Sequence, residues 1–332
     1  MPELPHVGMT RRDLKRGWSA RAMRVARASH ARRPMILLTG ATGTVGLPLV
    51  RALRRAGQPV RAILRDQRKA GLLQDLGAEI FVGDLAGPES YLEAFRGVDR
   101  AFLLTPAGPG QAGMEIGFID GAIAAGVSLV VKHSAIGAEP SALGVGSAHG
   151  QVERYLQDKR VPHVVVRPTQ FMQNLLRWTP SIARARALVI PLVDESVRVN
   201  LVDVRDVVEV EFDALTQSKH TGHTYVAAGP ELLTYEEVVE RLSKGVGSPI
   251  PLRVLPADRY REEARAAGYP LGPVNRLVDY YSTLRTGHTA LSVTGGDVAA
   301  VTGHEPRSLG EFAREYAEAL YEPRPEAASW MG

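Results

Sequence analysis

A glycine-rich segment, TGATGTVG at residues 39–46, has the spacing G-x-x-G-x-x-G. It directly follows the apolar run MILLT at residues 35–39 and directly precedes a segment with helical apolar spacing. In that context the first glycine permits a tight turn, the second lets the backbone approach a pyrophosphate, and the third allows close packing of helix on strand. The free N–H groups of the helix N-terminus favour an anion there. We therefore predict a dinucleotide site formed by Thr39, Gly40, Thr42, Gly43, Thr44, Val45 and Gly46, with a simple glycine turn as the alternative.

The residue that ends the next apolar run indicates which dinucleotide fits. An acidic residue about 20 positions after the loop would bind the ribose 2′-hydroxyl of NAD. This sequence has Arg65 instead, followed by Arg68 and Lys69, although Asp66 lies one position later. Because a guanidinium fork suits a 2′-phosphate and stacks on adenine, we predict NADP(H). The alternative is that these cations form only a solvated helix start.

Apolar runs alternate with amphipathic segments from residue 35 onward. The predicted strands cover residues 35–39, 59–64, 78–82, 100–104, 128–134 and 161–167. The predicted helices between them cover residues 45–56, 69–76, 89–95, 111–125 and 152–158. Strands joined by helices of this length pair in parallel through right-handed crossovers. The expected fold class is therefore α/β, a Rossmann-type doubly wound parallel sheet that binds ligands at the carboxyl ends of its strands.

The pattern becomes less regular after residue 170, and helical segments predominate. Short strands are predicted at residues 189–193, 197–202 and 224–228, and helices at 204–214, 234–244, 258–281 in two pieces and 308–320. We predict a Rossmann domain at 35–170 and a smaller, mostly helical C-terminal lobe at 171–322, with segments near 200–228 returning to the Rossmann domain. Asp203 and Asp206 are interpreted as helix caps that pair with Arg205, rather than as catalytic acids.

The charge of the chain is concentrated at one end. The net charge is +4, but residues 1–34 contain nine Arg or Lys and two acidic residues, so the remainder carries −3. We interpret residues 1–34 as a basic, disordered leader and 323–332 as a tail, with a nucleic-acid or membrane-surface arm as the alternative for the leader. The body itself shows no basic bias toward nucleic acid.

The composition excludes several classes of protein. The chain has no Cys, which excludes disulfides, thiolate metal sites and a Cys nucleophile, and it fits a reducing cytoplasm. No apolar run reaches the roughly 18 residues that would span a bilayer. His220 and His223 flank a Gly-containing turn without a third ligand nearby, so we predict no metal site.

Several motifs together resemble the NmrA-like family of atypical short-chain dehydrogenase/reductases. They are the loop at 39–46, Arg65 at the strand end, Gly83-Asp84-Leu85, VKHSAIGA at 131–138, His149-x-x-x-Glu153, and VRPTQFMQN at 166–174. The likeness covers about residues 35–321 and is most specific before residue 174. It implies an NADP(H) site in a Rossmann domain with a small lobe over the nicotinamide. It is similar to the quinone-reductase branch, although some members bind the dinucleotide as redox sensors without turnover.

The resemblance also implies positions for further site residues. Asp84 and Leu85 would lie near the adenine, and Thr105 and Pro106 would pass the ribose of the cofactor. Lys132, Ser134, Pro168 and Phe171 would flank the nicotinamide. All of these residues follow the carboxyl ends of predicted strands, where such folds bind ligands. Ordinary core packing for Phe171 and a turn cap for Asp84 are the alternatives.

The proton donor of ordinary short-chain dehydrogenases is missing from its usual register. The resemblance to extended members aligns Glu153, and this puts His149 at the Lys position and Val145 at the Tyr position. Tyr155 and Lys159 then lie too near the helix end, so we interpret them as a surface pair. A quinone or conjugated enone spreads the charge that hydride addition creates, so it needs no strong acid. We expect His149, Lys132 and Ser134 to serve the acceptor, with satisfied core roles as the alternative.

The expected function is an NADPH-dependent oxidoreductase that transfers hydride to a quinone, enone or similar conjugated small molecule. A non-catalytic NADP(H)-sensing protein and a non-redox isomerase or cyclase on the same fold are the alternatives. The expected partners are a small aromatic or conjugated substrate and, at most, a second copy of the chain, so that the protein is a cytoplasmic monomer or homodimer.

Overall fold

A computed structural model describes residues 33–139, 145–178, 187–192, 194, 196–285, 293 and 296–321. The predicted leader at 1–32 and the tail at 323–332 lie outside these ranges. The described chain forms two compact units. We call residues 33–168 with 207–226 the Rossmann unit, and residues 169–206 with 227–321 the C-terminal unit. The division follows Pro168, near the predicted position after 170, and the returning segment is 207–226.

The Rossmann unit is built on a seven-stranded sheet with the order β10-β6-β5-β4-β1-β2-β3. Its strands are β1 (Ile36–Leu38), β2 (Val60–Leu64), β3 (Glu79–Val82), β4 (Arg100–Leu103), β5 (Leu129–His133), β6 (His163–Pro168) and β10 (Thr224–Ala227). Each neighbouring pair of strands in the order β6-β5-β4-β1-β2-β3 is parallel. The order confirms the predicted doubly wound sheet, whose strand sequence reverses direction between β1 and β4.

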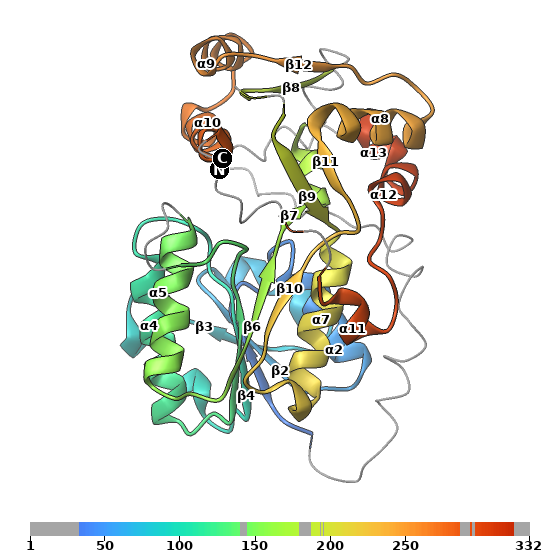
Figure 1. The fold of residues 1–332 in the computed structure, drawn as a ribbon. Helices are drawn as coiled ribbons and strands as arrows, with labels where there is room; N and C mark the ends of the chain where they lie inside the picture. The colour runs from blue at the N-terminus through green and yellow to red at the C-terminus, as the bar shows by residue number, and fades with distance from the viewer. Residues whose placement is uncertain are drawn as a thin grey trace. The chain divides into compact units, whose positions relative to one another are not determined.

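Helices cover both faces of this sheet (Figure 1). One face carries α4 (Gln111–Ala124) and α5 (Val145–Asp158), and the other carries α2 (Gly46–Arg55) and α7 (Val204–Thr216). The α4–α5 face encloses a buried core in which the Phe95 and Phe118 ring centroids are 4.9 Å apart. Burial on both faces explains why the strands read as continuous apolar runs.

At three of the predicted helices, the structure differs from the prediction in the length or the type of helix. Residues 89–95 form two 3₁₀ turns, η2 (Pro88–Ser90) and η3 (Leu92–Phe95). The helix predicted at 152–158 begins at Val145, because buried positions such as His149 and Val152 outweigh the weak propensity of Gly146 and Gly150. The helix predicted at 308–320 is divided at Tyr316 into α12 (Leu309–Glu315) and α13 (Ala317–Tyr321). The short α3 (Gly71–Asp75) follows the turn η1 (Gln67–Lys69).

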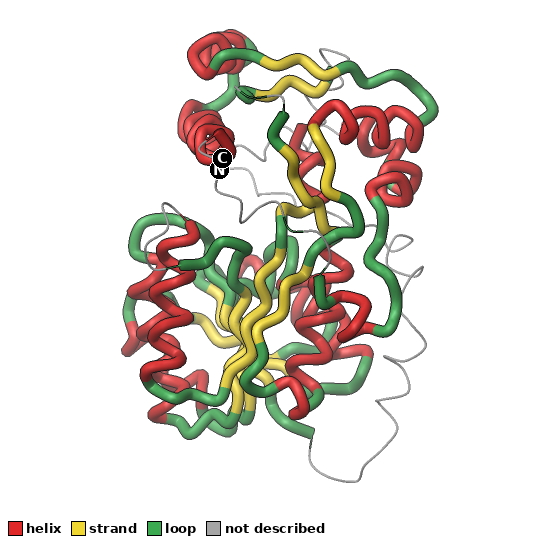
Figure 2. The backbone as a smooth tube through the Cα atoms, viewed as in Figure 1, coloured by secondary structure: helices red, strands yellow, loops and turns green. Residues whose placement is uncertain are grey.

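The C-terminal unit contains two small sheets among its helices (Figure 2). One has the order β11-β9-β7 and the other pairs β12 with β8. Their strands are β7 (Gln170–Phe171), β8 (Leu188–Ile190), β9 (Arg198–Val202), β11 (Leu232–Thr234) and β12 (Leu252–Val254). The helices are α8 (Tyr235–Val246), α9 (Ala257–Ala266), α10 (Leu271–Arg285), α11 (Val298–Thr302), α12 and α13, with the 3₁₀ turn η4 (Met172–Trp178).

Two helices of the C-terminal unit, α8 and α12, begin with capping boxes. Thr234 Oγ1 accepts a hydrogen bond from Glu237 N at 3.2 Å, and Thr234 N donates to Glu237 Oε2 at 2.8 Å. Ser308 and Glu311 repeat this exchange at the start of α12. Each box satisfies backbone N–H groups that a helix start leaves without intrahelical partners. Within the described residues, no helix combines the length and the apolar character needed to cross a bilayer.

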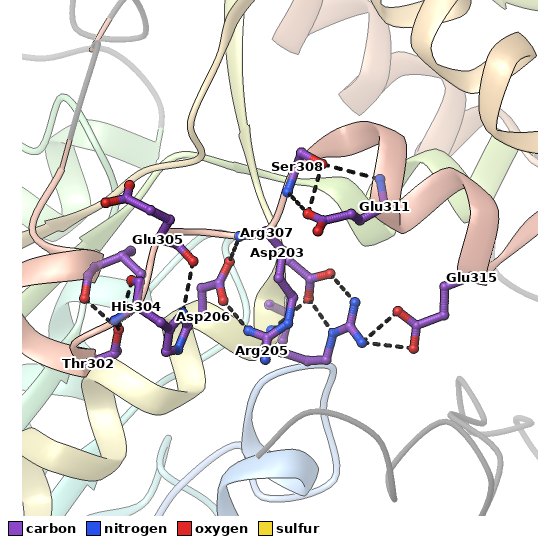
Figure 3. Close-up of polar contacts among 12 residues, drawn as sticks. Asp203, Arg205, Asp206, Thr302, His304, Glu305, Arg307, Ser308, Glu311 and Glu315 are labelled. Atoms are coloured by element: carbon purple, nitrogen blue, oxygen red, sulfur yellow. Dashed lines mark hydrogen bonds and ion pairs between the residues drawn. The ribbon is translucent and has the colours of Figure 1, made fainter. Parts of the chain in front are cut away.

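An ionic chain fixes the start of α7 within the C-terminal unit (Figure 3). Asp203 Oδ2 lies 2.7 Å from Arg205 Nη2, and Arg205 Nη1 lies 2.7 Å from Glu315 Oε2 on α12. Asp206 pairs with the Arg307 guanidinium and accepts the Arg307 backbone N–H at 2.8 Å. The predicted capping and pairing of Asp203 with Arg205 is confirmed, whereas Asp206 forms its ion pair with Arg307 rather than with the predicted Arg205.

Candidate active site

The glycine loop has a backbone that only glycine can form at two positions. Gly40 has φ +63°, in the left-handed region that favours glycine. At Gly46, an added Cβ would lie 2.1 Å from the carbonyl oxygen of Gly40. This contact is far too close for any side chain, so Gly46 permits α2 to begin directly against the turn. The sequence-based roles of these two glycines therefore agree with the backbone geometry.

The open side of the loop is free for a ligand. Gly43 is exposed, and Thr42 and Thr44 are half-buried. The N-cap residue of α2, Val45, makes no side-chain capping hydrogen bond, and the first turn of α2 contains no acidic residue. The Gly43 N–H donates to Gly40 O at 3.0 Å and the Leu47 N–H donates to Gly43 O at 3.1 Å, so the N-terminus of α2 offers an anion its positive dipole end and the N–H groups between these two.

Thr39 is placed differently from the other loop residues. Its side chain is buried, its Oγ1 donates to Leu104 O at 2.8 Å, and it accepts the Leu104 N–H at 2.8 Å. This exchange fastens the end of β1 to the end of β4. The hydroxyl of Thr39 therefore supports the loop, and only the backbone of this residue is available for the predicted cofactor contact.

Arg65 and Arg68 follow β2, and both are exposed. Arg68 is held by Asp66, with Arg68 Nη2 2.9 Å from Asp66 Oδ2 and Arg68 N 3.0 Å from Asp66 Oδ1. The hydrogen bonds from Arg68 lower the pKa of Asp66, which is therefore ionised. Within the described part of the chain, no carboxylate lies within ion-pair distance of Arg65. Arg65 is thus available for a phosphate beside the exposed Lys69, and Asp66 is occupied by Arg68.

Asp84 and Leu85 follow β3 in a tight turn. Asp84 Oδ1 accepts the Ala86 N–H at 3.1 Å, and the Asp84 backbone N–H donates to Ser90 Oγ at 2.9 Å. Asp84 is exposed, whereas Leu85 is half-buried against the α4–α5 core. Asp84 therefore acts as a turn cap in this structure, and its predicted proximity to the adenine stays a prediction.

The carboxyl end of β5 holds a fully buried charge cluster that the sequence only partly indicated. Lys132 and Glu115 are both 0% exposed, and Lys132 Nζ lies 3.0 Å from Glu115 Oε2. The ammonium also lies 3.0 Å from His149 Nδ1 and donates to the His133 carbonyl oxygen. Thr105 Oγ1 donates to Glu115 Oε1 at 2.6 Å, which turns its hydroxyl inward. Pro106 is exposed beyond it.

Neither Glu115 nor its neighbour Gln111 was predicted. Both lie on the buried side of α4, and Gln111 Nε2 is 3.4 Å from Glu115 Oε1. A charged residue that interrupts an otherwise apolar helix face, as Glu115 does, is the signal that could have found this cluster. A buried carboxylate requires a partner, and the sequence offers the buried Lys132 on the neighbouring strand.

Burial determines the charge state of His149. Desolvation, followed by the charges of Lys132 and His133, lowers the pKa of His149 to about 2. The imidazole is therefore neutral at physiological pH, and its Nδ1 accepts a hydrogen bond from the Lys132 ammonium. A neutral imidazole can accept or donate hydrogen bonds, but it carries no extra proton to give to a substrate.

Ser134 also has its hydroxyl bound. Ser134 Oγ donates to Glu153 Oε1 at 2.5 Å, and Arg167 Nε donates to the same oxygen at 3.1 Å. The Glu153 carboxylate raises the pKa of Arg167, chiefly through its hydrogen bond. These contacts join the ends of β5 and β6 to α5. Successive side chains of a strand point to opposite faces, so Lys132 and Ser134 face α5, whereas His133 faces α7 and lies 2.5 Å from Glu211.

Tyr155 and Lys159 lie on the outside of α5. Tyr155 Oη donates to Asp120 Oδ1 on α4 at 2.6 Å, and Lys159 Nζ lies 5.4 Å from the centroid of the Tyr155 ring. This hydrogen bond raises the pKa of Tyr155. The pair is therefore the surface arrangement that the register analysis predicts. Pro168 ends β6, and Phe171 ends β7, where it pairs with Val202 and is half-buried.

The sequence was compared with protein families and with curated proteins. The family described as NmrA-like matches residues 33–313. An NAD(P)H azoreductase of Xenophilus azovorans is 32% identical over 86% of this chain and 99% of its own length. The (4-alkanoyl-5-oxo-2,5-dihydrofuran-3-yl)methyl phosphate reductase of Streptomyces griseus is 35% identical over 86% of this chain and 99% of its own length.

Solved structures share the fold. The Citrobacter sp. triphenylmethane reductase complexed with NADP(H) superimposes with a TM-score of 0.75 at 23% identity, covering 85% of this chain and 99% of that protein. An NADPH-dependent quinone oxidoreductase of Escherichia coli, complexed with NADPH, gives a TM-score of 0.72 at 23% identity, covering 84% of this chain and 98% of that protein. The similarity extends through both units.

Proposed function

Because this chain belongs to the NmrA-like family, we propose that it is an NADPH-dependent reductase of conjugated small molecules. The proposal of a dinucleotide cofactor rests on the open glycine loop, which lies at a helix N-terminus without a side-chain cap. Both curated relatives described above are named as reductases, and one of them is an NAD(P)H enzyme.

The residues present fit NADP(H). The backbone of residues 40–46 would hold the pyrophosphate, because its glycines leave no side chain between the ligand and the N-terminus of α2. Arg65 would hold the 2′-phosphate, because it is exposed and no described carboxylate pairs with it. When bound, the cofactor supplies a hydride, that is, one hydrogen with two electrons.

The proposed acceptor class follows from the protonation of the buried clusters. The Lys132 ammonium is enclosed by three partners, His149 is neutral, and the Ser134 hydroxyl donates to Glu153. Burial lowers the pKa of Lys132, but each of these groups already has a hydrogen-bond partner within the protein. We assign them to positioning the carboxyl ends of β5 and β6. An acceptor that delocalises the developing negative charge, such as a quinone, an enone or an azo compound, fits a site with hydrogen-bond donors alone.

Two measurements test this proposal. Binding of NADPH and NADH is compared by titration calorimetry, and we expect NADPH to bind more tightly. NADPH is then mixed with the protein and a panel of quinones, enones and azo dyes while the absorbance of the reduced nicotinamide is followed. Oxidation that depends on the protein supports the reductase. Tight NADPH binding without oxidation across the panel contradicts it and favours a sensor, and acceptor conversion at constant NADPH favours an isomerase or cyclase.

A further inference from the structure

An arginine near the carboxyl end of β6 is held by a glutamate on α5. Arg167 Nε donates to Glu153 Oε1 at 3.1 Å, and the Arg167 Nη2 group pairs with Glu153 Oε2. The Glu153 side chain is only 5% exposed and also accepts the hydrogen bond from Ser134. All three residues belong to the Rossmann unit. Two contacts to one carboxylate fix the plane of a guanidinium, so the direction of its remaining N–H groups is fixed as well.

The edge of this guanidinium that faces away from Glu153 still has donors to offer. An arginine side chain carries five N–H groups, and the contacts with Glu153 use one on Nε and one on Nη2. Within the residues that the structure describes, the N–H groups of Arg167 Nη1 have no acceptor. Nη1 is not a buried atom, and the Arg167 side chain is 31% exposed. Two N–H groups on Nη1 and one on Nη2 are therefore available to a ligand.

A second carboxylate acts on this guanidinium from a greater distance. The hydrogen bond with Glu153 raises the pKa of Arg167, burial opposes this, and the charges of Glu153 and Glu139 add to the increase. Glu139 is exposed, and its carboxylate is not within ion-pair distance of Arg167. Arg167 thus keeps its positive charge, and the charge of Glu139 weakens the attraction of this guanidinium for an anion.

The order of the strands puts Arg167 on the side of the sheet where the acceptor is expected. In this sheet β2 lies on one side of β1, and β4, β5 and β6 follow on the other. A cofactor held by the glycine loop after β1 and by Arg65 after β2 directs its nicotinamide toward the carboxyl ends of β4, β5 and β6. Arg167 is the last residue but one of β6, so it lies at this end of its strand.

We propose that Arg167 forms a binding subsite for an oxyanion on the acceptor, such as a carboxylate, a sulfonate or a phosphate. This inference rests on the proposed reductase function and adds an anionic substituent to the conjugated acceptors. The N–H groups that Nη1 and Nη2 keep form a fork that matches two oxygens of such a group. Arg167 takes no part in the transfer of hydride, and it selects the acceptor by binding a group that does not react.

Steady-state kinetics with two matched acceptors test this selection. The acceptors 1,4-naphthoquinone and 1,4-naphthoquinone-2-sulfonate differ by one anionic group, and the chain has no Cys that could react with them. We expect Arg167→Gln to lower the ratio of kcat/KM for the sulfonate to kcat/KM for the neutral quinone by roughly 10-fold, as for the loss of a hydrogen bond to a charged group. Glu139→Gln should raise this ratio, because it removes the competing charge. Comparing variants cancels the difference in reduction potential between the two quinones.

Arg61→Gln is the matched control for these kinetics. Arg61 also pairs with a glutamate, Glu79, at 2.9 Å, but it lies near the start of β2, at the opposite end of the sheet. This variant should keep the wild-type ratio. Equal ratios in the wild type and Arg167→Gln would overturn the inference, and so would an equal fall in Arg61→Gln. NADPH oxidation by neutral 1,4-naphthoquinone in the wild type reports separately on the proposed function.

A binding measurement decides the matter even for a protein that turns over no acceptor. Naphthalene-2-sulfonate and the neutral naphthalene-2-sulfonamide are titrated into the protein with NADP⁺ present. We expect the wild type to bind the sulfonate more tightly, and Arg167→Gln to weaken the sulfonate alone by about 10-fold. Arg167→Lys keeps a cation beside Glu153 without the fork, so it should lose about 3-fold, and it replaces Arg167→Gln if that variant does not fold. Wild-type sulfonate affinity in the Arg167 variants, or equal binding of both probes by the wild type, would contradict the subsite.

Discussion

Two arginines follow the same strand, but only Arg68 forms an ion pair with a described carboxylate, and this difference explains how the sequence can specify one phosphate site. Arg68 is neutralised by Asp66, which is only one position from Arg65. Asp66 would argue for NAD if its carboxylate were available. Because Arg68 holds this carboxylate, Arg65 stays available for a phosphate, with the exposed Lys69 nearby in the sequence.

Replacing Arg65 should therefore change cofactor preference. We expect Arg65→Ala to weaken NADPH binding by roughly 10- to 100-fold, the size of a lost charge-assisted hydrogen bond of about 1.5–3 kcal/mol. Binding of NADH, which lacks the 2′-phosphate, should change little. Titration calorimetry measures both, and Arg68→Ala is the control. A larger loss for Arg68→Ala than for Arg65→Ala would contradict the assignment.

The buried histidine at residue 149 should make stability sensitive to acid. Its pKa is about 2 in the folded protein, against an ordinary value of 6.5. The unfolded chain therefore binds a proton below pH 6.5 that the folded chain excludes, and stability is lost as the pH falls from 6.5. Below about pH 6 this loss approaches about 1.4 kcal/mol per pH unit from His149 alone.

Urea denaturation of the wild type and of His149→Gln, between pH 5 and 7.5, isolates this contribution. Glutamine can accept the hydrogen bond from Lys132 without titrating, so the variant should lose less stability toward low pH. His223→Gln, at an exposed position, is the control and should follow the wild type. Parallel pH dependences for wild type and His149→Gln would show that His149 does not titrate as the burial requires.

At the scale of elements, the glycine loop and the start of α2 act together. The turn brings the Gly40 carbonyl oxygen against the first residue of α2, and the uncapped helix start points into the open side of the loop. The glycine loop and α2 could be predicted from the sequence. The role of each glycine follows from its local backbone conformation and needs no partner from a distant part of the chain.

One substitution in the loop and one control substitution test this arrangement. We expect Gly46→Ala to reduce NADPH affinity by at least about 10-fold and to destabilise the protein by about 1–3 kcal/mol, because the added methyl would overlap the Gly40 carbonyl. Gly113→Ala is the control, since a Cβ at Gly113 on α4 meets nothing within 4 Å. It should stabilise the protein by about 0.5–1 kcal/mol. Thermal unfolding measures the stability of the two variants, and calorimetry measures their affinity for NADPH. A Gly46→Ala variant with wild-type stability and affinity would contradict the loop geometry.

At the scale of the whole molecule, ion pairs fasten segments that are far apart in the sequence. Asp206 and Arg307 are 101 residues apart, and Arg205 and Glu315 are 110 residues apart. Asp206 is completely buried, whereas Arg307 is 17% exposed (Figure 3). Closing such long loops costs chain entropy, so these contacts help to define the C-terminal unit.

Removing one partner of the Asp206–Arg307 pair should be costly. We expect Arg307→Met to lower the free energy of unfolding by about 3–5 kcal/mol, because it removes the guanidinium that pairs with the buried Asp206 carboxylate. Arg253→Met is the control. Its pair with Glu263 is 3.4 Å long and exposed, and such surface pairs contribute about 0–1 kcal/mol. Chemical denaturation measures the free energy of unfolding of both variants. Equal values would show that other groups stabilise the Asp206 carboxylate.

The sequence by itself determined the features that depend on neighbouring residues. They are the glycine loop, the strand–helix order, the capping boxes, and the alternation that puts Lys132 and His133 on opposite faces of β5. Only the tertiary structure decided that Lys132 meets Glu115 and His149, and that Glu153 meets Ser134 and Arg167. Periodicity gives the face on which a side chain lies, but it does not give the partner that another element brings to that face. The charge state of a buried group depends on that partner and on burial, and for Lys132 and His149 both come from the tertiary structure.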